Sequence, residues 1–232
     1  DRVQFFGGHI NFLGKAFHHC PSLEELDAAP AVEPAFYACG AGMLIDREIF
    51  LKSGGFDKDY FMIFEDVDLG WRLNLMGLKT LLVRDARIYH REGASLNSLD
   101  YAKKALWWER NALWTIYKNH SSAHLEKIWP AALAMAFKRN RILVEAGRQQ
   151  DFERHHHGVT AAIRGLDRLK KKRARVQAGR RIPDEELIPF FPDPFRVWAY
   201  GEEHYRLFAD GQYAIFRDDC LDRFKIRPIF NR

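Results

Sequence analysis

The stretch FMIFEDVDLGWRLNLMG, residues 61–77, decides the fold expected for this chain. Five apolar residues recur in and just after it at steps of three and four: Phe64, Val67, Trp71, Leu75 and Leu78. This period gives a helix one apolar face. Acidic residues crowd the beginning of the stretch and Gly77 follows its end, as is typical of a helix that begins near Glu65. Residues 67–75 also alternate as a strand would, but the signals at both ends favour the helix.

Three carboxylates, Glu65, Asp66 and Asp68, lie in the first turn of this expected helix. The simple explanation is that acids complement the helix dipole, and that Asp68 pairs with Arg72 one turn later. Three acids are more than a cap requires, and the aromatic run at residues 60–64 would wall them from water. A carboxylate in such surroundings can take a proton from a hydroxyl. On a helix, Asp66 and Asp68 point about 200° apart, so the two cannot serve one substrate atom.

The sequence around this helix predicts an α/β layer. Residues 36–38 and 43–45 are short strand-like runs on either side of a glycine-rich turn at 39–42, and residues 80–83 and 87–89 form a second such pair. Between the pairs, a helix is expected from the N-cap Asp46 to the stop at Gly54. Strands and helices that alternate in this way indicate an α/β architecture, with a parallel half-sheet.

The strand signals end after Ser98. Residues 99–119, 123–146 and 150–177 are expected to form long amphipathic helices, and the proline- and aromatic-rich tail from Pro183 is expected to be extended. We therefore divide the chain into residues 1–97, the α/β part, residues 98–182, a helical and basic extension, and residues 183–232, the tail.

Composition limits the class of protein. The chain has 232 residues, of which 47% are hydrophobic and 29% charged, and a net charge of +5; these values exclude a disordered chain. Three distant cysteines do not make a disulfide framework, which favours a reducing compartment. No run reaches the ~20 apolar residues of a membrane-spanning helix. The sequence begins without Met and without a signal-peptide layout, so we expect it to be cut from a longer protein.

The order of three motifs resembles a known family. They are CGAGMLIDREIFLKSGGFD at 39–57, FEDVDLGWRL at 64–73 and YHREGAS at 89–95. In this order they resemble the C-terminal half of a family 2 glycosyltransferase, in the rhamnosyltransferase-like branch that builds bacterial cell-surface glycans. The segments QFFGGHINFLG at 4–14, WWERNALWTIYKN at 107–119 and the basic stretch at 161–186 agree with it.

The resemblance implies the C-terminal half of a GT-A domain followed by a mainly helical extension. It implies an inverting transfer of a sugar, with rhamnose one candidate, from a nucleoside-diphosphate donor to a lipid-linked or polysaccharide acceptor. Asp66 would be the general base and Glu65 would orient the acceptor. The small-residue turn would let the sugars approach the backbone: Gly40, Ala41 and Gly42. Three further residues would contact substrate: Trp71, Arg72 and Arg110.

The resemblance also implies a divalent ion, Mg²⁺ or Mn²⁺, with His90 as one ligand. The ion would neutralise the charge that builds on the leaving diphosphate. The nucleotide-binding half of the family, with its Asp-x-Asp motif, has no counterpart in this sequence. Asp57-Lys58-Asp59 spells the pattern, but it falls where the family has an ordinary turn, and we place no metal there. We therefore do not expect the chain alone to catalyse sugar transfer.

Other signals support weaker hypotheses. Residues 164–181 carry nine basic residues against one acid, Asp167, and form either a solvated charged face or a contact with anionic lipid headgroups. Nucleic acid is disfavoured, because the run has no base-stacking aromatics. The histidine-rich segments 18–20 and 155–157 lack a zinc-ligand spacing and are expected to be solvated. The tryptophans of residues 107–129 are expected to pack between helices.

Two rival functions remain. One is a non-catalytic membrane-surface or scaffold module that uses helices 99–178. The other is a glycoside hydrolase, which needs two acids ~5–10 Å apart across a sugar, an arrangement that sequence neighbours such as Glu65 and Asp66 cannot provide. For the glycosyltransferase, the expected location is the cytoplasm, peripheral at the inner face of the plasma membrane.

Overall fold

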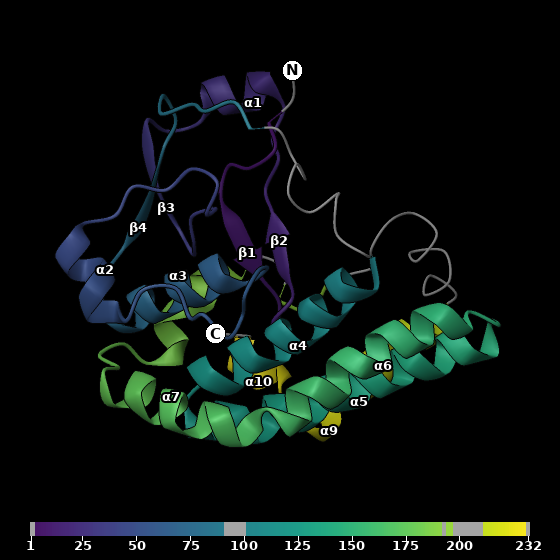
Figure 1. The fold of residues 1–232 in the computed structure, drawn as a ribbon. Coiled ribbons are helices and arrows are strands. Elements are labelled where there is room, and N and C mark those ends of the chain that lie inside the picture. Colours follow the sequence, from purple (N-terminus) through teal and green to yellow (C-terminus); the bar gives the residue numbers. More distant parts are fainter. Residues whose placement is uncertain (1–2, 91–100, 192–193, 197–210, 231–232) are drawn as a thin grey trace.

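A computed structural model describes residues 3–90, 101–191, 194–196 and 211–230. Short strands and the first three helices lie on one side, and a layer of long helices lies on the other (Figure 1). Helix α3 contacts β4 and α2 on the strand side and α4 on the helical side. This central position makes α3 the element that joins the two parts.

The strand part contains two separate two-stranded antiparallel sheets. Strand β1 (Gly8–Ile10) pairs with β2 (Ala16–His18), and β3 (Val32–Ala35) pairs with β4 (Thr80–Val83). Three helices accompany them: α1 (Leu23–Ala28), α2 (Arg47–Ser53) and α3 (Glu65–Leu75).

The helical part contains four long helices: α4 (Tyr101–Asn119), α5 (Ser122–Glu145), α6 (Gln149–Arg164) and α7 (Leu166–Ala178). Helix α6 packs against α4 and α5, and α7 packs against α4. Three shorter elements follow: the 3-10 helix η1 (Asp184–Phe190), α9 (Gln212–Arg223) and α10 (Arg227–Phe230). None of the described helices has the length and hydropathy needed to cross a membrane.

Several predicted elements are confirmed. Helix α2 begins after Asp46, whose carboxylate accepts the N–H of Ile49, and ends at Gly54 in the left-handed conformation. Helix α3 covers the predicted stretch, and β4, α4 and α5 lie where they were expected. No disulfide joins Cys20, Cys39 and Cys220 to one another.

The predicted parallel half-sheet is wrong for the described residues. The runs 36–38, 43–45 and 87–89 are not strands. Phe36 and Tyr37 are fully buried; their backbone lies against helix α3, and the ring of Tyr37 reaches β2, where its hydroxyl donates to the carbonyl of Phe17 at 3.4 Å. Asn74 donates its side-chain N–H to the carbonyl of Phe36 at 2.7 Å, and a Cβ on Gly70 would lie 2.4 Å from the Cβ of Tyr37. The helix takes the place of the partner strand.

The single helix predicted over 150–177 is two helices. They meet at Gly165, where an added Cβ would lie 2.4 Å from the ring of Trp114. The Trp114 indole N–H donates to the carbonyl of Ala162 at 3.1 Å, which fixes the ring under the break. The tail beyond Pro183 is also not simply extended, since η1 and α9 form within it and bury Leu187 and Tyr213 in the core.

A buried ionic network holds α3 to α4. The carboxylate of Asp68 is fully buried and is bound by Arg72 and Lys118, each at 2.8 Å. It also accepts from Asn119 at 3.0 Å and from the hydroxyl of Tyr60 at 3.3 Å. Burial alone would raise the pKa of Asp68, but the two cations outweigh burial and lower it. Asp68 is therefore the carboxylate that joins the cation of α3 to the cation of α4, and Lys118 binds Asp57 as well, at 2.8 Å.

We predict that Asp68→Asn lowers the free energy of unfolding by about 3–5 kcal/mol, because it leaves the buried Arg72 without its counter-charge and Lys118 with Asp57 alone. Urea unfolding followed by far-UV circular dichroism measures the change. The exposed Asp85→Asn is the matched control and should change stability by less than about 0.5 kcal/mol. Equal stability of the two variants would contradict the role assigned to the network.

Candidate active site

The loop that leads into α3 is strained. Phe61, Ile63 and Phe64 have φ angles of 64°, 69° and 74°, in a region of backbone conformation that residues other than glycine rarely adopt. Backbone strain of this kind persists only where surrounding contacts impose it, and it clusters at functional sites. This loop sets the direction in which the first turn of α3 presents its carboxylates.

The segment Glu109-Arg110-Asn111 of α4 imposes that conformation. The side-chain N–H groups of Asn111 donate to the carbonyls of Tyr60, Met62 and Ile63, at 3.2, 2.9 and 2.6 Å. Arg110 donates to the carbonyls of Asp59 and Tyr60, and its guanidinium lies 4.4 Å from the ring centre of Trp114. Arg110, predicted to contact substrate, binds the backbone of the loop in this structure.

Asp66 lies against the glycine-rich turn. Its Oδ2 accepts the backbone N–H of Gly40 at 2.9 Å, and its Oδ1 accepts that of Val67 at 2.8 Å. A Cβ on Gly40 would lie 3.7 Å from Oδ2 of Asp66 and 3.9 Å from Oε1 of Glu65. The structure therefore brings together Gly40, Glu65 and Asp66, which come from two motifs that are 26 residues apart.

The other two residues of the turn are exposed. Ala41 and Gly42 are both open to solvent, and the N–H of Gly42 closes the turn on the carbonyl of Cys39 at 3.0 Å. A Cβ on Gly42 would lie 2.4 Å from Cδ1 of Ile88. A glycine here lets the turn and the chain after β4 approach each other.

The carboxylate pair is electrostatically unusual. Both side chains are half-buried, and Oε2 of Glu65 has no hydrogen-bond partner among the described residues. Burial, with the neighbouring Asp66 as second cause, raises the pKa of Glu65 to about 7. Burial also raises the pKa of Asp66, against the opposing effect of the Gly40 and Val67 N–H groups. Carboxylates with raised pKa values are better proton acceptors.

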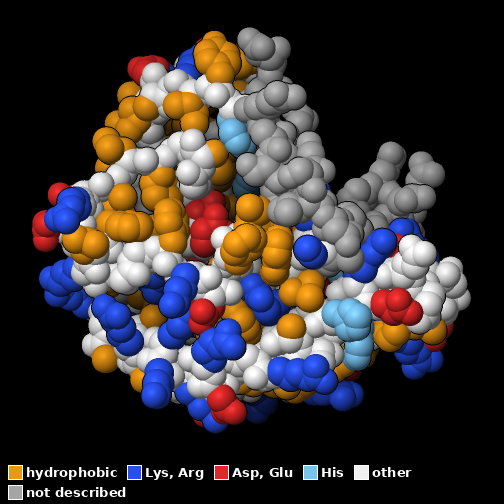
Figure 2. All heavy atoms as spheres, in the orientation of Figure 1, with side chains coloured by type: hydrophobic (Ala, Val, Ile, Leu, Met, Phe, Trp, Pro, Cys, Tyr) orange, Lys and Arg blue, Asp and Glu red, His pale blue; other side chains and the backbone are white. Residues whose placement is uncertain are grey.

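Hydrophobic side chains frame the pair. Figure 2 shows acidic side chains near the middle of this face among hydrophobic ones. Phe61 is 69% exposed, and its ring centre lies 5.1 Å from that of Trp107. An apolar ledge next to two carboxylates can hold the ring of a sugar or an apolar tail while a carboxylate contacts a hydroxyl.

Trp71 and Arg72, predicted to contact substrate, lie on the side of α3 that faces the protein interior. Trp71 is buried, with its ring centre 5.4 Å from that of Phe36. Arg72 binds Asp68 and donates to the carbonyls of Ser53 and Gly55 at 2.6 and 2.7 Å. The predicted opposition of Asp66 and Asp68 is confirmed: one faces the glycine turn and the other faces the interior.

His90 stands apart from the carboxylates. It is exposed, and within the described ranges no group of three or more potential ligands includes it. Residues 91–95 of its motif lie outside the described residues. The described side chains around His90 therefore do not fit a divalent-ion site without further ligands.

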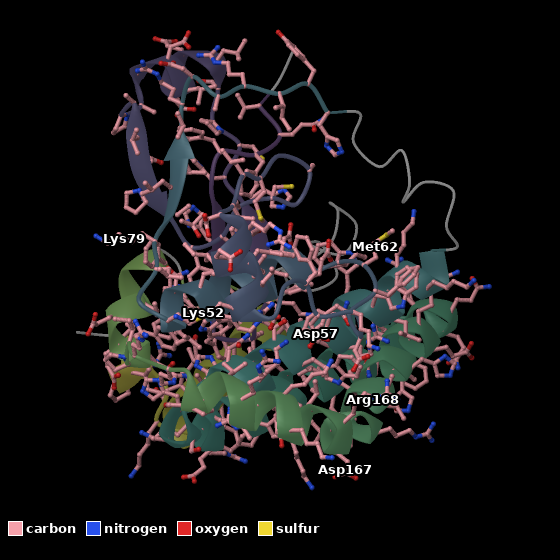
Figure 3. All side chains as sticks on the ribbon, turned by 60° about the vertical axis from the view of Figure 1, so that its left-hand side comes forward. Lys52, Asp57, Met62, Lys79, Asp167 and Arg168 are labelled. Atoms are coloured by element: carbon pink, nitrogen blue, oxygen red, sulfur yellow. The ribbon has the colours of Figure 1, made fainter. Side chains whose placement is uncertain are left out.

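Lysine side chains from helices α4 and α7 bind both aspartates of the Asp57-Lys58-Asp59 segment. Lys118 and Lys172 bind Asp57, and Lys172 also binds Asp59 at 2.7 Å. Burial alone would raise the pKa of Asp57, but the two lysines outweigh burial and lower this pKa to about 2. In Figure 3, Asp57 lies between the two layers, whereas Asp167 and Arg168 lie on the outer side of the helical layer.

The basic run divides into two sets. Lys172, Arg173 and Arg180 point inward, the last two to backbone carbonyls at the end of α4 and the start of its turn. Six others are exposed: Arg164, Arg168, Lys170, Lys171, Arg175 and Arg181. The charged face predicted from the sequence therefore carries fewer free charges than the composition suggests.

One histidine expected to be solvated is buried. His155 lies 3.2 Å from the carboxylate of Glu109, which Arg139 also binds through two contacts of 2.8 Å. The sequence reasoning missed this cluster and the loop-holding role of Asn111. A buried glutamate inside an apolar helix face was the available signal, because such a residue needs a cation nearby.

Comparisons with known proteins bear on the same chemistry. The chain is 39% identical over 66 residues to N-acetylglucosaminyl-diphospho-decaprenol L-rhamnosyltransferase of Mycobacterium tuberculosis (strain ATCC 25618 / H37Rv), a match of 28% of this chain and 22% of the relative. It is 37% identical over 68 residues to O-antigen biosynthesis protein RfbC of Myxococcus xanthus, a match of 29% of this chain and 5% of that protein. No protein-family model matches the chain, and no solved structure matches it significantly.

These partial matches support a glycosyltransferase relationship for the matched segment. The chain spans only about a fifth of the rhamnosyltransferase and a twentieth of RfbC.

We predict that Glu65→Gln stabilises the protein at pH 8. A carboxyl whose pKa is raised on folding opposes folding once it ionises, so its cost grows as pH rises from its unfolded pKa towards 7. The free energy of unfolding at pH 8 should rise by about 1–2 kcal/mol, after discounting for solvent screening at this half-buried group. Urea unfolding at pH 5 and pH 8 measures it.

The exposed Glu48→Gln is the matched control for this experiment. Its stability should match the wild type at both pH values. An equal effect of the two substitutions, or a gain by Glu65→Gln at pH 5 but not at pH 8, would contradict the assigned charge state of Glu65.

Proposed function

We propose that the chain carries the acceptor side of an inverting glycosyltransferase active site, with Asp66 as the general base. The observation that supports this most is the position of the Glu65–Asp66 pair. It lies at the first turn of α3, with one carboxylate bound to the backbone of Gly40 and an exposed aromatic ledge beside it. The local similarity to a rhamnosyltransferase points to the same reaction.

The proposed chemistry is a single displacement. The Asp66 carboxylate takes the proton of an acceptor hydroxyl while the oxygen attacks the anomeric carbon of the donor. The bond from that carbon to the diphosphate breaks, and the nucleoside diphosphate leaves with the bonding electrons. Glu65 binds a second hydroxyl of the acceptor and sets its orientation. The proton then passes from Asp66 to solvent.

The substrates follow from the relatives. We propose a nucleoside-diphosphate sugar such as that of rhamnose as donor, and a lipid-linked or polysaccharide glycan as acceptor. A divalent ion, Mg²⁺ or Mn²⁺, would stabilise the leaving diphosphate, with His90 as one ligand and the others from outside the described residues. The six exposed cations of residues 164–181 would hold the enzyme at an anionic membrane surface, close to a lipid-linked acceptor.

We predict that Asp66→Asn reduces transfer at least about 100-fold while the protein stays folded, because the amide cannot accept the hydroxyl proton. The assay is release of nucleoside diphosphate by the full-length protein, offered a panel of nucleotide sugars with lipid-linked acceptors and Mn²⁺ or Mg²⁺. Asp85→Asn, on the exposed turn after β4, is the control and should keep wild-type turnover.

An Asp66→Asn variant with more than about a tenth of wild-type turnover would show that another group is the base. Folded wild-type protein that releases nucleoside diphosphate from no donor would instead favour the membrane-surface module. Binding to anionic vesicles that is unaffected by Asp66→Asn would then identify the exposed cations of residues 164–181 as the working part.

A further inference from the structure

A second cluster of polar side chains lies at the turn between α4 and α5. It consists of His120 and His124, which lie on either side of that turn, and Asp184 at the start of η1. One potential ligand atom from each residue lies within 4.8 Å of the others, and all three residues are buried. Within the described residues, this is the one group of three or more such side chains with metal-binding geometry.

The histidines contact the carboxylate without the geometry of hydrogen bonds. Oδ2 of Asp184 lies 3.0 Å from Nδ1 of His124 and 3.5 Å from Nδ1 of His120. Yet within the described part of the chain, neither ring nitrogen of His120 has a hydrogen-bond partner, and Nδ1 of His124 has none. His120 is only 3% exposed, so water does not readily satisfy it. Buried polar atoms left in this way carry a cost, and a missing ligand is one explanation.

The two distances from Asp184 to the histidine nitrogens fit a zinc ion, and the nitrogens themselves lie within 4.8 Å of each other. When bonds of about 2.0–2.1 Å radiate tetrahedrally from Zn²⁺, neighbouring ligand atoms lie about 3.3 Å apart. The two contacts of Asp184 bracket this value. A shared ion would also explain why the Nδ1 atoms of the two histidines lie close to Oδ2 of Asp184 without donating an N–H to it, because each atom would direct a lone pair at the ion. Two imidazoles and a carboxylate are a ligand set typical of zinc.

The surroundings provide second contacts for the ligands. Nε2 of His124 lies 3.4 Å from Oε1 of Glu185, the carboxylate–histidine arrangement that orients metal ligands. Arg180 donates to Oδ1 of Asp184 at 2.7 Å, and Oδ2, which also accepts the backbone N–H of Ser121 at 2.8 Å, lies next to the histidines. A cavity of about 10 Å³ borders the cluster, close to the space that one water needs, and it provides a place for a fourth ligand.

We propose that His120, His124 and Asp184 bind a structural Zn²⁺ ion that ties the α4–α5 turn to the C-terminal segment. The site lies among apolar side chains of η1 and α10, so its role is to hold these elements rather than to act on substrate. It would stabilise the end of α4, whose Lys118 and Asn119 bind Asp68.

The test uses the full-length protein without a histidine tag, purified from zinc-supplemented medium and dialysed against metal-free buffer. Elemental analysis should find about one zinc ion per chain. His120→Asn and His124→Asn should each lose the zinc, although asparagine keeps an N–H close to the position of Nδ1. The exposed His157→Ala should keep it. A strong chelator should lower the Tm of the wild type by several degrees and leave that of both Asn variants unchanged.

If the variants do not fold, Co²⁺ added to the chelated wild type gives an independent reading, since a tetrahedral site produces visible absorption bands that Zn²⁺ abolishes. Folded wild type that holds no more zinc than His124→Asn after dialysis against zinc chloride, with a Tm that chelator does not change, would overturn the proposal. The cluster would then be a contact between two histidines and an aspartate. The result does not depend on transferase activity.

Discussion

The packing of helix α3 against helix α4 depends on one buried carboxylate, that of Asp68. Asp68 is fully buried in α3, and its carboxylate binds cations and amides from the same helix and from the end of α4. A buried charge is tolerated only when its partners are complete, so α3 and α4 cannot slide or rotate relative to each other without a large cost. The orientation of α3 is therefore fixed by its inner face.

Because the inner face of α3 is fixed, the orientation of the outer face of the same turn is fixed as well. Two residues before Asp68, Asp66 faces the opposite way and meets the glycine turn, while the loop ahead of it is held in a strained conformation by Asn111. Helix α4 thus supplies both the counter-charges of the inner face and the clamp of the loop. Strain and partly desolvated carboxylates both cost stability, and such costs are typical of sites selected for chemistry rather than for stability.

Local features of this fold could be predicted, and distant ones could not. The caps of α2 and the period of α3 lie within a few residues of the structures they specify, and the opposite directions of Asp66 and Asp68 follow from helix geometry alone. The break at Gly165 depends on Trp114, and the true partner of Arg110 is a backbone carbonyl 50 residues away. Sheet pairing failed for the same reason, since a helix occupies the place where a strand was expected.

The most direct test of the account is the pH dependence of kcat/KM for the wild type and Glu65→Gln, with the donor found to be active. The account predicts an acid limb in the wild type well above the pH range of an ordinary carboxyl group, because burial raises both pKa values in the pair and the Asp66 charge further raises that of Glu65. Glu65→Gln removes the carboxyl whose pKa is raised to about 7, so the limb should shift to lower pH. An acid limb that is unchanged by Glu65→Gln would contradict the claim that the pair acts as one unit in proton transfer.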